Sequence, residues 1–266
     1  MKILDLSDDV ILVTGGAGSL GSAISHELAA AGASVMVADR DLGEASRVAL
    51  QIVDEGGSAV SAHLDVGSSS SVDSVVGEAV AHFGRLTGLV NAAGVLRTGD
   101  LPSLSDEEWE LMLNVNVSGT FRATRSVAPH LKSEGRGSIV NLSSVSAFIG
   151  SADGAAYTAS KGAVLSFTVG TAGELAPFGI RVNAVCPGWV DGGFTHQAME
   201  RSENPAALAA YARQLHPLGR MASTRDVANA VVWLMSSDAC FVTGTSLFVD
   251  GGFMVQRGLN AASETQ

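Results

Sequence analysis

A tyrosine and a lysine four residues apart, Tyr157 and Lys161, are the side chains best suited to acid–base chemistry in this sequence. If the segment AAYTASKGAVLSFT is helical, as its composition predicts, both side chains lie on one face about one turn apart. A free tyrosine titrates near ~10, and a nearby ammonium favours its phenolate form. We therefore expect Tyr157 to act as an acid or base, with its pKa lowered by Lys161 and by further positive charge at the site.

A second chemical feature is the glycine-rich segment TGGAGSLG, residues 14–21, which lies between an apolar strand and an Ala-rich helix. Such a turn lets backbone N–H groups and a helix N-terminus approach a pyrophosphate closely. The next strand ends at Asp39, 24 residues after Gly15, where a carboxylate can accept hydrogen bonds from both adenosine ribose hydroxyls. Together these two features predict a dinucleotide site.

The residues after the second strand also bear on which dinucleotide binds. The carboxylate of Asp39 would repel a 2′-phosphate, which favours NAD over NADP. The neighbouring Arg40 could instead reach a 2′-phosphate, so NADP stays open as an alternative.

The elements that must position these groups form a βαβ rhythm. Short β-branched runs alternate with Ala-rich helical stretches, and the expected strands cover residues 10–14, 34–39, 58–66, 87–94, 137–144, 180–188 and 245–252. This pattern predicts an α/β Rossmann fold: a doubly wound, seven-stranded parallel sheet with helices on both faces and a ligand crevice at the carboxyl ends of the strands.

The chain is expected to form a single domain over residues 1–266, with a cofactor half at about 1–140 and a catalytic and substrate half at about 141–252. The stretch 193–223 interrupts the rhythm and is helical in composition. We expect a lid over the crevice at residues 193–215. The polar tail after Gly252 is expected to be disordered at its end.

Composition excludes several classes of function. A formal net charge of −11 and no Lys/Arg cluster argue against nucleic acid as a partner. No apolar run is long enough to span a membrane, and no signal-like segment opens the sequence, so we expect a cytoplasmic protein. The two cysteines, Cys186 and Cys240, form no CxxC pair, and no His/Cys cluster has metal-ligand spacing, so no metal site is expected.

Further motifs follow the glycine turn in a specific order: HLDV at 63–66, NAAG at 91–94, VNVSGTF around Asn116, NLSSVSA at 141–147, YTASK at 157–161 and VNAVCPG at 182–188. In these motifs the chain resembles the short-chain dehydrogenase/reductase family over essentially its whole length. The resemblance implies a cofactor site made by Gly15, Gly18, Ser19, Leu20, Gly21, Asp39, Arg40, Asp65, Val66, Asn91, Ala92, Gly94, Tyr157, Lys161, Pro187, Gly188 and Val190.

The same resemblance implies four catalytic residues: Asn116, Ser144, Tyr157 and Lys161. Ser144 would hold the substrate oxygen as hydride arrives at the carbon, and Tyr157 would transfer the proton. Lys161 would also bind the nicotinamide ribose, and Asn116 would hold a water that links Lys161 to solvent. Ser143 is not assigned to the site, because adjacent residues of a strand point to opposite faces.

The chain departs from the family pattern at two positions. Ser19 stands where the family turn usually has glycine, with Gly18 just before it. Gly192 stands where a threonine usually contacts the carboxamide of the cofactor, and Thr195 is the candidate to replace it. These differences concern the cofactor contacts rather than the reaction.

The substrate site is expected to involve Ser144, Ser146, Leu96, Phe148, Trp189 and Phe194. No cluster of Arg or Lys stands out in the expected pocket segments, 95–100, 145–156 and the lid 193–215. This favours a neutral, moderately apolar secondary alcohol or ketone over a polyol or a carrier-bound oxoacyl group. An NADPH-dependent carbonyl or 3-oxoacyl reductase and a non-catalytic dinucleotide-binding protein are the alternatives. The resemblance further implies a homotetramer, paired through helices at about 106–131 and 155–176.

Overall fold

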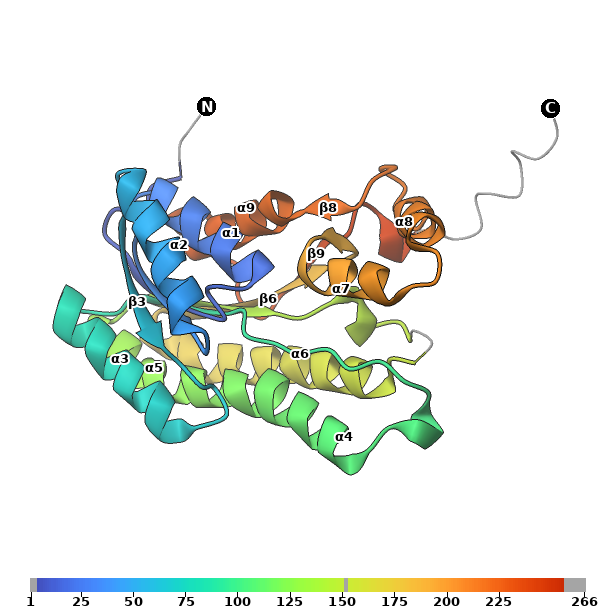
Figure 1. The fold of residues 1–266 in the computed structure, drawn as a ribbon. Coiled ribbons are helices and arrows are strands. Elements are labelled where there is room, and N and C mark those ends of the chain that lie inside the picture. Colours follow the sequence, from blue (N-terminus) through green and yellow to red (C-terminus); the bar gives the residue numbers. More distant parts are fainter. Residues whose placement is uncertain (1–3, 151–152, 256–266) are drawn as a thin grey trace.

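Seven parallel strands form one sheet in this computed structural model, which describes residues 4–150 and 153–255 (Figure 1). In spatial order the strands are β3 (Ser58–His63), β2 (Ser34–Asp39), β1 (Val10–Thr14), β4 (Gly88–Asn91), β5 (Gly137–Leu142), β6 (Ile180–Pro187) and β9 (Ser246–Val249). The predicted α/β Rossmann-like fold is confirmed.

Helices cover both faces of the sheet. One layer contains α1 (Ser19–Ala30), α2 (Leu42–Asp54) and α9 (Thr224–Met235), and the other contains α3 (Ser69–Phe83), α4 (Asp106–Met112), α5 (Thr120–Glu134) and α6 (Ala155–Leu175) (Figure 1). Short helical turns are η1 (Leu101–Ser103), η2 (Leu113–Gly119), η3 (Val145–Ala147), η4 (Ala176–Phe178), η5 (Ser237–Ala239) and η6 (Phe253–Val255).

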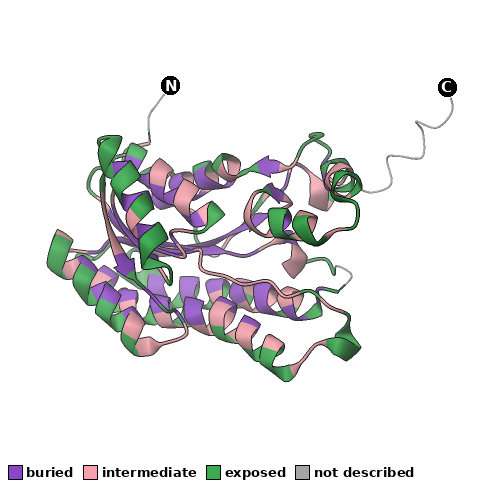
Figure 2. Cartoon of the chain, viewed as in Figure 1, coloured by how far each residue is buried: buried purple, intermediate pink, exposed green. Residues whose placement is uncertain are grey.

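The strands are buried because both of their faces are covered by apolar helix stripes. Every residue of β1, with the sequence VILVT, is buried, and so is every residue of β4 (Figure 2). Continuous apolar runs of this kind are typical of parallel sheets packed between two helix layers. The two layers have separate cores, one around α1 and α9 and the other around α3, α5 and α6.

Several strands end earlier than the sequence predicts. Strand β3 stops at His63 because Asp65 turns the chain, its Oδ1 accepting the N–H of Gly67 at 2.8 Å. Only Asn91 of the NAAG segment belongs to β4. Likewise β5 ends at Leu142, so Ser144 lies two residues beyond the strand rather than closing it.

The segment expected as a lid is helical. Strand β7 (Val190–Asp191) is followed by α7 (Gly193–Arg201), α8 (Pro205–Gln214) and β8 (Ala222–Ser223), and β7 and β8 form a small two-stranded sheet. In Figure 1, α7 and α8 lie together on the right of the molecule, away from α1 and α2. Because this segment starts at the carboxyl end of β6, it lies at the end of the sheet where ligands of such folds bind.

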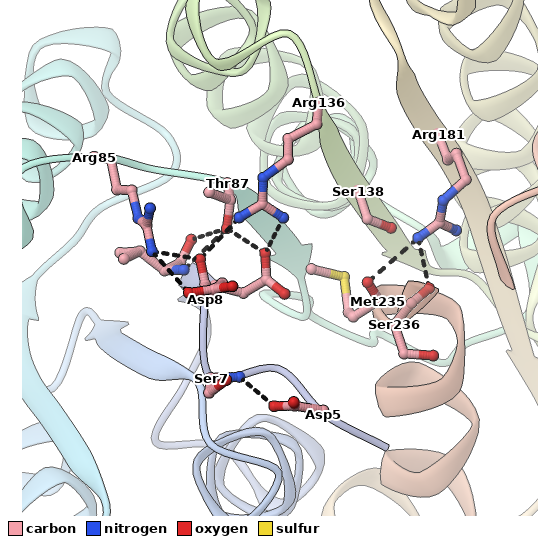
Figure 3. A network of polar contacts seen from close by, with 12 residues as sticks. Asp5, Ser7, Asp8, Arg85, Thr87, Arg136, Ser138, Arg181, Met235 and Ser236 are labelled. Carbon is pink, nitrogen blue, oxygen red and sulfur yellow. Dashed lines mark hydrogen bonds and ion pairs between the residues drawn. The ribbon is translucent and has the colours of Figure 1, made fainter. Parts of the chain in front are cut away.

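The opposite end of the sheet holds a polar network (Figure 3). A cavity of about 370 Å³ lies among the same residues. Arg136 binds the Asp9 carboxylate at 2.9 Å, and Arg181 donates to the last carbonyls of α9, including that of Leu234 at 2.7 Å. These arginines therefore tie the N-terminal segment and α9 to the start of the sheet. Their donors are engaged by the protein itself, which indicates a structural role for this end.

Candidate active site

The backbone of the glycine turn after β1 lies too close to neighbouring backbone for side chains at Gly15 and Gly21. Gly15 has a φ of +65°, and a Cβ there would lie 2.6 Å from the Cα of Ala93. A Cβ at Gly21 would collide with the carbonyl of Gly15. Helix α1 begins at Ser19 with Gly18 as its N-cap and no side-chain cap, so its first N–H groups point free toward an incoming group. This arrangement fits a pyrophosphate.

The two departures from the family pattern meet in space. A Cβ at Gly192 would collide with the Oγ of Ser19 and would lie 3.3 Å from Cγ2 of Thr224. Gly192 and Gly193 have φ values of +155° and +49°, which favour glycine at the start of α7. Ser19 therefore occupies the space that a threonine side chain at position 192 would need. Thr195 is buried in the first turn of α7, and its proposed role stays a prediction.

Asp39 ends β2 beside the glycine turn. Its Oδ2 accepts the N–H of Ala17 at 3.0 Å, and its Oδ1 accepts the N–H of Asp41 at 3.0 Å. The carboxylate is thereby fixed next to the loop where the ribose is expected, and each oxygen keeps a free lone pair. Arg40 is exposed and makes no ion pair with another residue of the described part of the chain.

The expected adenine-side residues lie beyond β3. Asp65 is exposed and forms the turn with Gly67, and Val66 is buried against Gly119. Both lie at the carboxyl edge of the sheet, on the same side as the glycine turn. Leu20 lies in the first turn of α1, partly buried.

The side chain of Asn91 belongs to a buried hydrogen-bond chain that the sequence did not predict. Its side chain is buried and its Nδ2 donates to Asn141 at 2.8 Å, while Asn141 donates in turn to Thr168 at 2.9 Å. The register pairs Thr14 with Asn91 and Asn91 with Asn141 across three strands. The amide of Asn91 therefore joins β4 to β5 beneath the site, and Ala92 and Gly94 form the loop above it.

Tyr157 and Ser144 come together from different elements. Tyr157 lies in the first turn of α6, and Ser144 caps η3, its Oγ accepting the N–H of Ser146 at 3.1 Å. Ser143 faces away, because its hydroxyl donates to the carbonyl of Lys161 at 3.0 Å. The choice of Ser144 over Ser143 agrees with this geometry.

Lys161 is buried on the same helix as Tyr157. Its Nζ donates to the carbonyl of Leu142 at 2.8 Å and lies 5.6 Å from the centre of the Tyr157 ring. Asn116 is buried too, in the π-helical stretch η2 rather than in a regular α-helix. Its amide donates to Ser160 at 3.0 Å and to the carbonyl of Val95 at 2.9 Å.

The electrostatics of the pair differ from the sequence-based expectation. Burial raises the pKa of Tyr157 to about 12, and a hydrogen bond from Ser144 offsets only part of this rise. Burial also lowers the pKa of Lys161 to about 8. In the chain alone, burial therefore dominates the pKa of Tyr157. The expected lowering by Lys161 together with the positive charge of a bound cofactor stays a prediction.

Of the expected substrate-site phenylalanines, Phe194 contacts Tyr157 and Phe148 packs elsewhere. The ring of Phe194 meets that of Tyr157 edge to face at 6.3 Å, whereas Phe148 is half exposed and packs on Phe248 at 4.8 Å. Leu96 lines a cavity together with Phe194. Ser151 and Ala152, in the segment 145–156 expected near the substrate, lie outside the described residues.

A buried histidine that the sequence analysis did not single out supports the end of β6. His216 Nδ1 contacts the carbonyl of Ala212 at 2.7 Å, and its Nε2 accepts the N–H of Trp189 at 3.1 Å. A Cβ at Gly188 would lie 2.5 Å from Nε2. His216 thus joins α8 to the segment from Pro187 to Val190.

The arrangement brings a phenol, a hydroxyl and a buried ammonium to one point at the carboxyl end of the sheet, beside a cradle for a dinucleotide. Such a set can transfer a proton to and from an oxygen while a hydride moves at the attached carbon. Within residues 4–150 and 153–255, no group of three or more His, Cys, Asp or Glu side chains could hold a metal ion. No helix in the same ranges is long and apolar enough to cross a membrane.

Comparison with known proteins decides the family. A family model described as enoyl-(acyl carrier protein) reductase matches residues 15–254. A cyclopentanol dehydrogenase from Comamonas is 39% identical over 250 residues, which cover 93% of this chain and 98% of that protein. The chain belongs to the short-chain dehydrogenase/reductase family. It is therefore an oxidoreductase.

Other relatives of this short-chain dehydrogenase/reductase agree over nearly full length. A 2-(S)-hydroxypropyl-CoM dehydrogenase from Xanthobacter autotrophicus is 36% identical and covers 93% of this chain and 97% of its own. The crystal structure of a gluconate 5-dehydrogenase from Burkholderia cenocepacia, in complex with NADP and tartrate, superposes with a TM-score of 0.89 at 31% identity, over 95% of this chain and 98% of that one.

Proposed function

We propose that this protein is an NAD-dependent dehydrogenase that interconverts a secondary alcohol and a ketone, with Tyr157 as the acid and base. The observation that carries the proposal is the juxtaposition of the Tyr157 hydroxyl, Ser144 and the buried Lys161 ammonium. Relatives named as dehydrogenases of cyclopentanol and of a cyclohexadiene diol support an alcohol as substrate.

The dinucleotide would be held by the glycine turn, by Asp39 and by the segment from Pro187 to Val190. The glycine turn leaves space that a Cβ would fill, and the Asp39 carboxylate has free acceptor positions. When bound, the nicotinamide supplies the hydride acceptor for oxidation and the hydride donor for reduction. Every other step falls to side chains of the chain itself.

Ser144 holds the substrate oxygen and orients it toward Tyr157. In alcohol oxidation the Tyr157 phenolate takes the hydroxyl proton as the C–H bond breaks, and in ketone reduction its hydroxyl returns that proton to the oxygen. Lys161 stabilises the phenolate by its charge and would bind the nicotinamide ribose. Asn116 orders the loop beside Lys161 and would hold the water that carries the proton to solvent.

The deciding experiment is an absorbance screen of NAD reduction over secondary alcohols, followed by the variant Tyr157→Phe. We expect the variant to keep the ring volume and the cofactor affinity but to lose turnover. A positioned acid or base contributes about 100-fold or more. Tyr211→Phe, at an exposed position in α8, is the matched control. Retention of more than about a hundredth of the wild-type rate in Tyr157→Phe would place the base elsewhere.

One observation favours a second candidate, an NADPH-dependent reductase of the same fold. The exposed Arg40 could meet a 2′-phosphate, and the similar gluconate 5-dehydrogenase was solved with NADP. The carboxylate of Asp39, fixed by two backbone N–H groups beside the glycine turn, weighs against it. Titration of the wild-type protein with NAD and with NADP separates the two candidates.

A further inference from the structure

A small cavity lies beside Phe194, between the loop after β4 and helix α7. Its volume is about 160 Å³. Leu96 and Thr98 line it from the loop, and Phe194, Gln197, Ala198 and Arg201 line it from α7.

Both walls of this cavity are tied to the catalytic residues. The α7 wall touches Tyr157 through the edge-to-face contact of Phe194. The loop wall follows Val95, whose backbone is held by Asn116, and the same amide reaches Ser160 on the catalytic helix α6. Phe194 therefore lies between the cavity and Tyr157, and Leu96 and Phe194, two residues expected at the substrate site, both line the cavity.

The face that α7 turns to the cavity changes in character along the helix. Residues 194, 197, 198 and 201 follow the i, i+3, i+4, i+7 spacing of one helical stripe. The stripe starts with the aromatic ring nearest Tyr157 and ends with a guanidinium, about 10 Å farther along the axis at a rise of ~1.5 Å per residue. A ligand that follows this stripe would meet apolar contacts first and a positive charge last.

Arg201 is the charged residue that lines the cavity, and its guanidinium makes no ion pair or hydrogen bond with another residue of the described chain. Several other arginines of this acidic protein are paired, such as Arg136 with Asp9 and Arg220 with Asp226, whereas Arg201, like Arg40, is exposed and unpaired among the described residues. A helix C-terminus favours a cation by itself, but that preference does not explain why the side chain borders a cavity beside Gln197. Both residues carry N–H donors on the same face.

We propose that Arg201 binds a carboxylate at the far end of the substrate, while the CH–OH group of the same molecule lies at Tyr157. The substrate class is thus a secondary alcohol, or the corresponding ketone, separated by an apolar chain from a terminal carboxylate. A guanidinium matches a carboxylate with two parallel hydrogen bonds, and the Gln197 amide supplies a further donor. A volume of about 160 Å³ suits a group of this size. The proposal rests on the proposed function.

The test compares three matched alcohols with the wild-type enzyme: 2-heptanol, 6-hydroxyheptanoate and the methyl ester of the latter. We expect kcat/KM for the carboxylate to exceed that for the ester about ten-fold, mainly through KM, because a charge-assisted contact contributes to binding. The preference should shrink as salt is added. Shorter and longer hydroxy acids, 4-hydroxypentanoate and 8-hydroxynonanoate, would show the preferred separation.

The variant Arg201→Gln should abolish the preference for the carboxylate over the ester, and Arg201→Lys should restore part of it. Arg213→Gln, the same change on the exposed last turn of α8, is the matched control and should leave the preference intact. Equal kcat/KM for carboxylate and ester in the wild type, or an equal loss in both glutamine variants, would overturn the proposal and leave the proposed function standing. Oxidation of none of the three alcohols, with no activity in the wider alcohol screen, would overturn both.

Discussion

Asn116 holds both backbone polar groups of Val95, accepting from its N–H at 2.8 Å and donating to its carbonyl at 2.9 Å. These two hydrogen bonds fix the loop after β4. The loop lies close to Lys161, since a Cβ at Gly94 would lie 3.4 Å from Asn116 Oδ1 and 3.7 Å from Lys161 Nζ. The Asn116 side-chain amide thus links the loop after β4, which forms one wall of the cavity, to helix α6, which carries Tyr157 and Lys161.

Replacing Asn116 by Asp tests this arrangement, because aspartate keeps the acceptor for the Val95 N–H but loses the donor for its carbonyl. We expect kcat/KM to fall at least ten-fold, since the buried Val95 carbonyl would lose its donor and would face a carboxylate oxygen instead. Steady-state kinetics and thermal unfolding should be measured together with Asn114→Asp, a matched change in the same π-helical stretch. Wild-type kinetics in Asn116→Asp would show that the loop is held by other contacts.

The ionisation of Tyr157 should depend on the cofactor. The chain has two tyrosines, so Tyr211→Phe leaves Tyr157 as the one phenol that absorbs at high pH. Because burial raises its pKa to about 12, we expect little phenolate at pH 9 to 10 in the chain alone. Saturating NAD⁺ should then generate the phenolate band, since a positive charge favours the ionised form. A band of full size without cofactor would contradict the effect of burial.

Burial of the Lys161 ammonium should lower the free energy of unfolding, although the proposed reaction requires this residue. Its pKa falls to about 8 on folding from an ordinary value of 10.5, so the unfolded chain binds the proton more tightly. The resulting penalty is fully present below pH 8 and disappears as the pH rises toward 10.5. Lys161→Met should therefore raise the free energy of unfolding at pH 7 by roughly 1 to 3 kcal/mol while abolishing turnover. Urea unfolding at pH 7 and pH 10 measures both the gain and its decline.

Asp39 should determine whether the protein binds NAD or NADP more tightly. We expect wild-type protein to bind NAD at least ten-fold more tightly than NADP, and Asp39→Ala to narrow the difference, because the carboxylate repels a 2′-phosphate. Fluorescence titration of both cofactors measures this, with Arg40→Ala as a control that should leave NAD affinity unchanged. Equal or tighter NADP binding by the wild type would instead support the NADPH-dependent reductase.

The outer faces of α5 and α6 should pair with a second copy. Phe121 and Val169 are exposed there, and Gly162, Gly170 and Gly173 have open space above them. Such apolar, small-residue surfaces suit close two-fold packing, and we expect a homotetramer. Light scattering should give a mass near four times 27.1 kDa, and Val169→Glu should lower it. A stable monomer at micromolar concentration would refute this assembly.

The sequence predicted the sheet well because parallel strands are continuous apolar runs, which leave a strong pattern. It predicted strand ends less well, because turn contacts such as Asp65 with Gly67 form only in the folded chain. For the same reason the partners of Asn91 and His216 were not foreseen, since they lie 50 and 27 residues away in the chain. The rise in the Tyr157 pKa was also missed, because burial is a property of packing and not of spacing.

The strand order has a consequence for synthesis of the chain. Strand β1 lies between β2 and β4, and β6 receives its outer neighbour only when β9 has been made. A growing chain thus carries Tyr157 and Lys161 long before residues 246–249 exist to support the strand that ends in Pro187. Long-range pairing of this kind slows folding and leaves strand edges bare meanwhile. A chain truncated shortly before residue 246 would therefore have the proposed catalytic residues but an unpaired β6 edge, which favours aggregation.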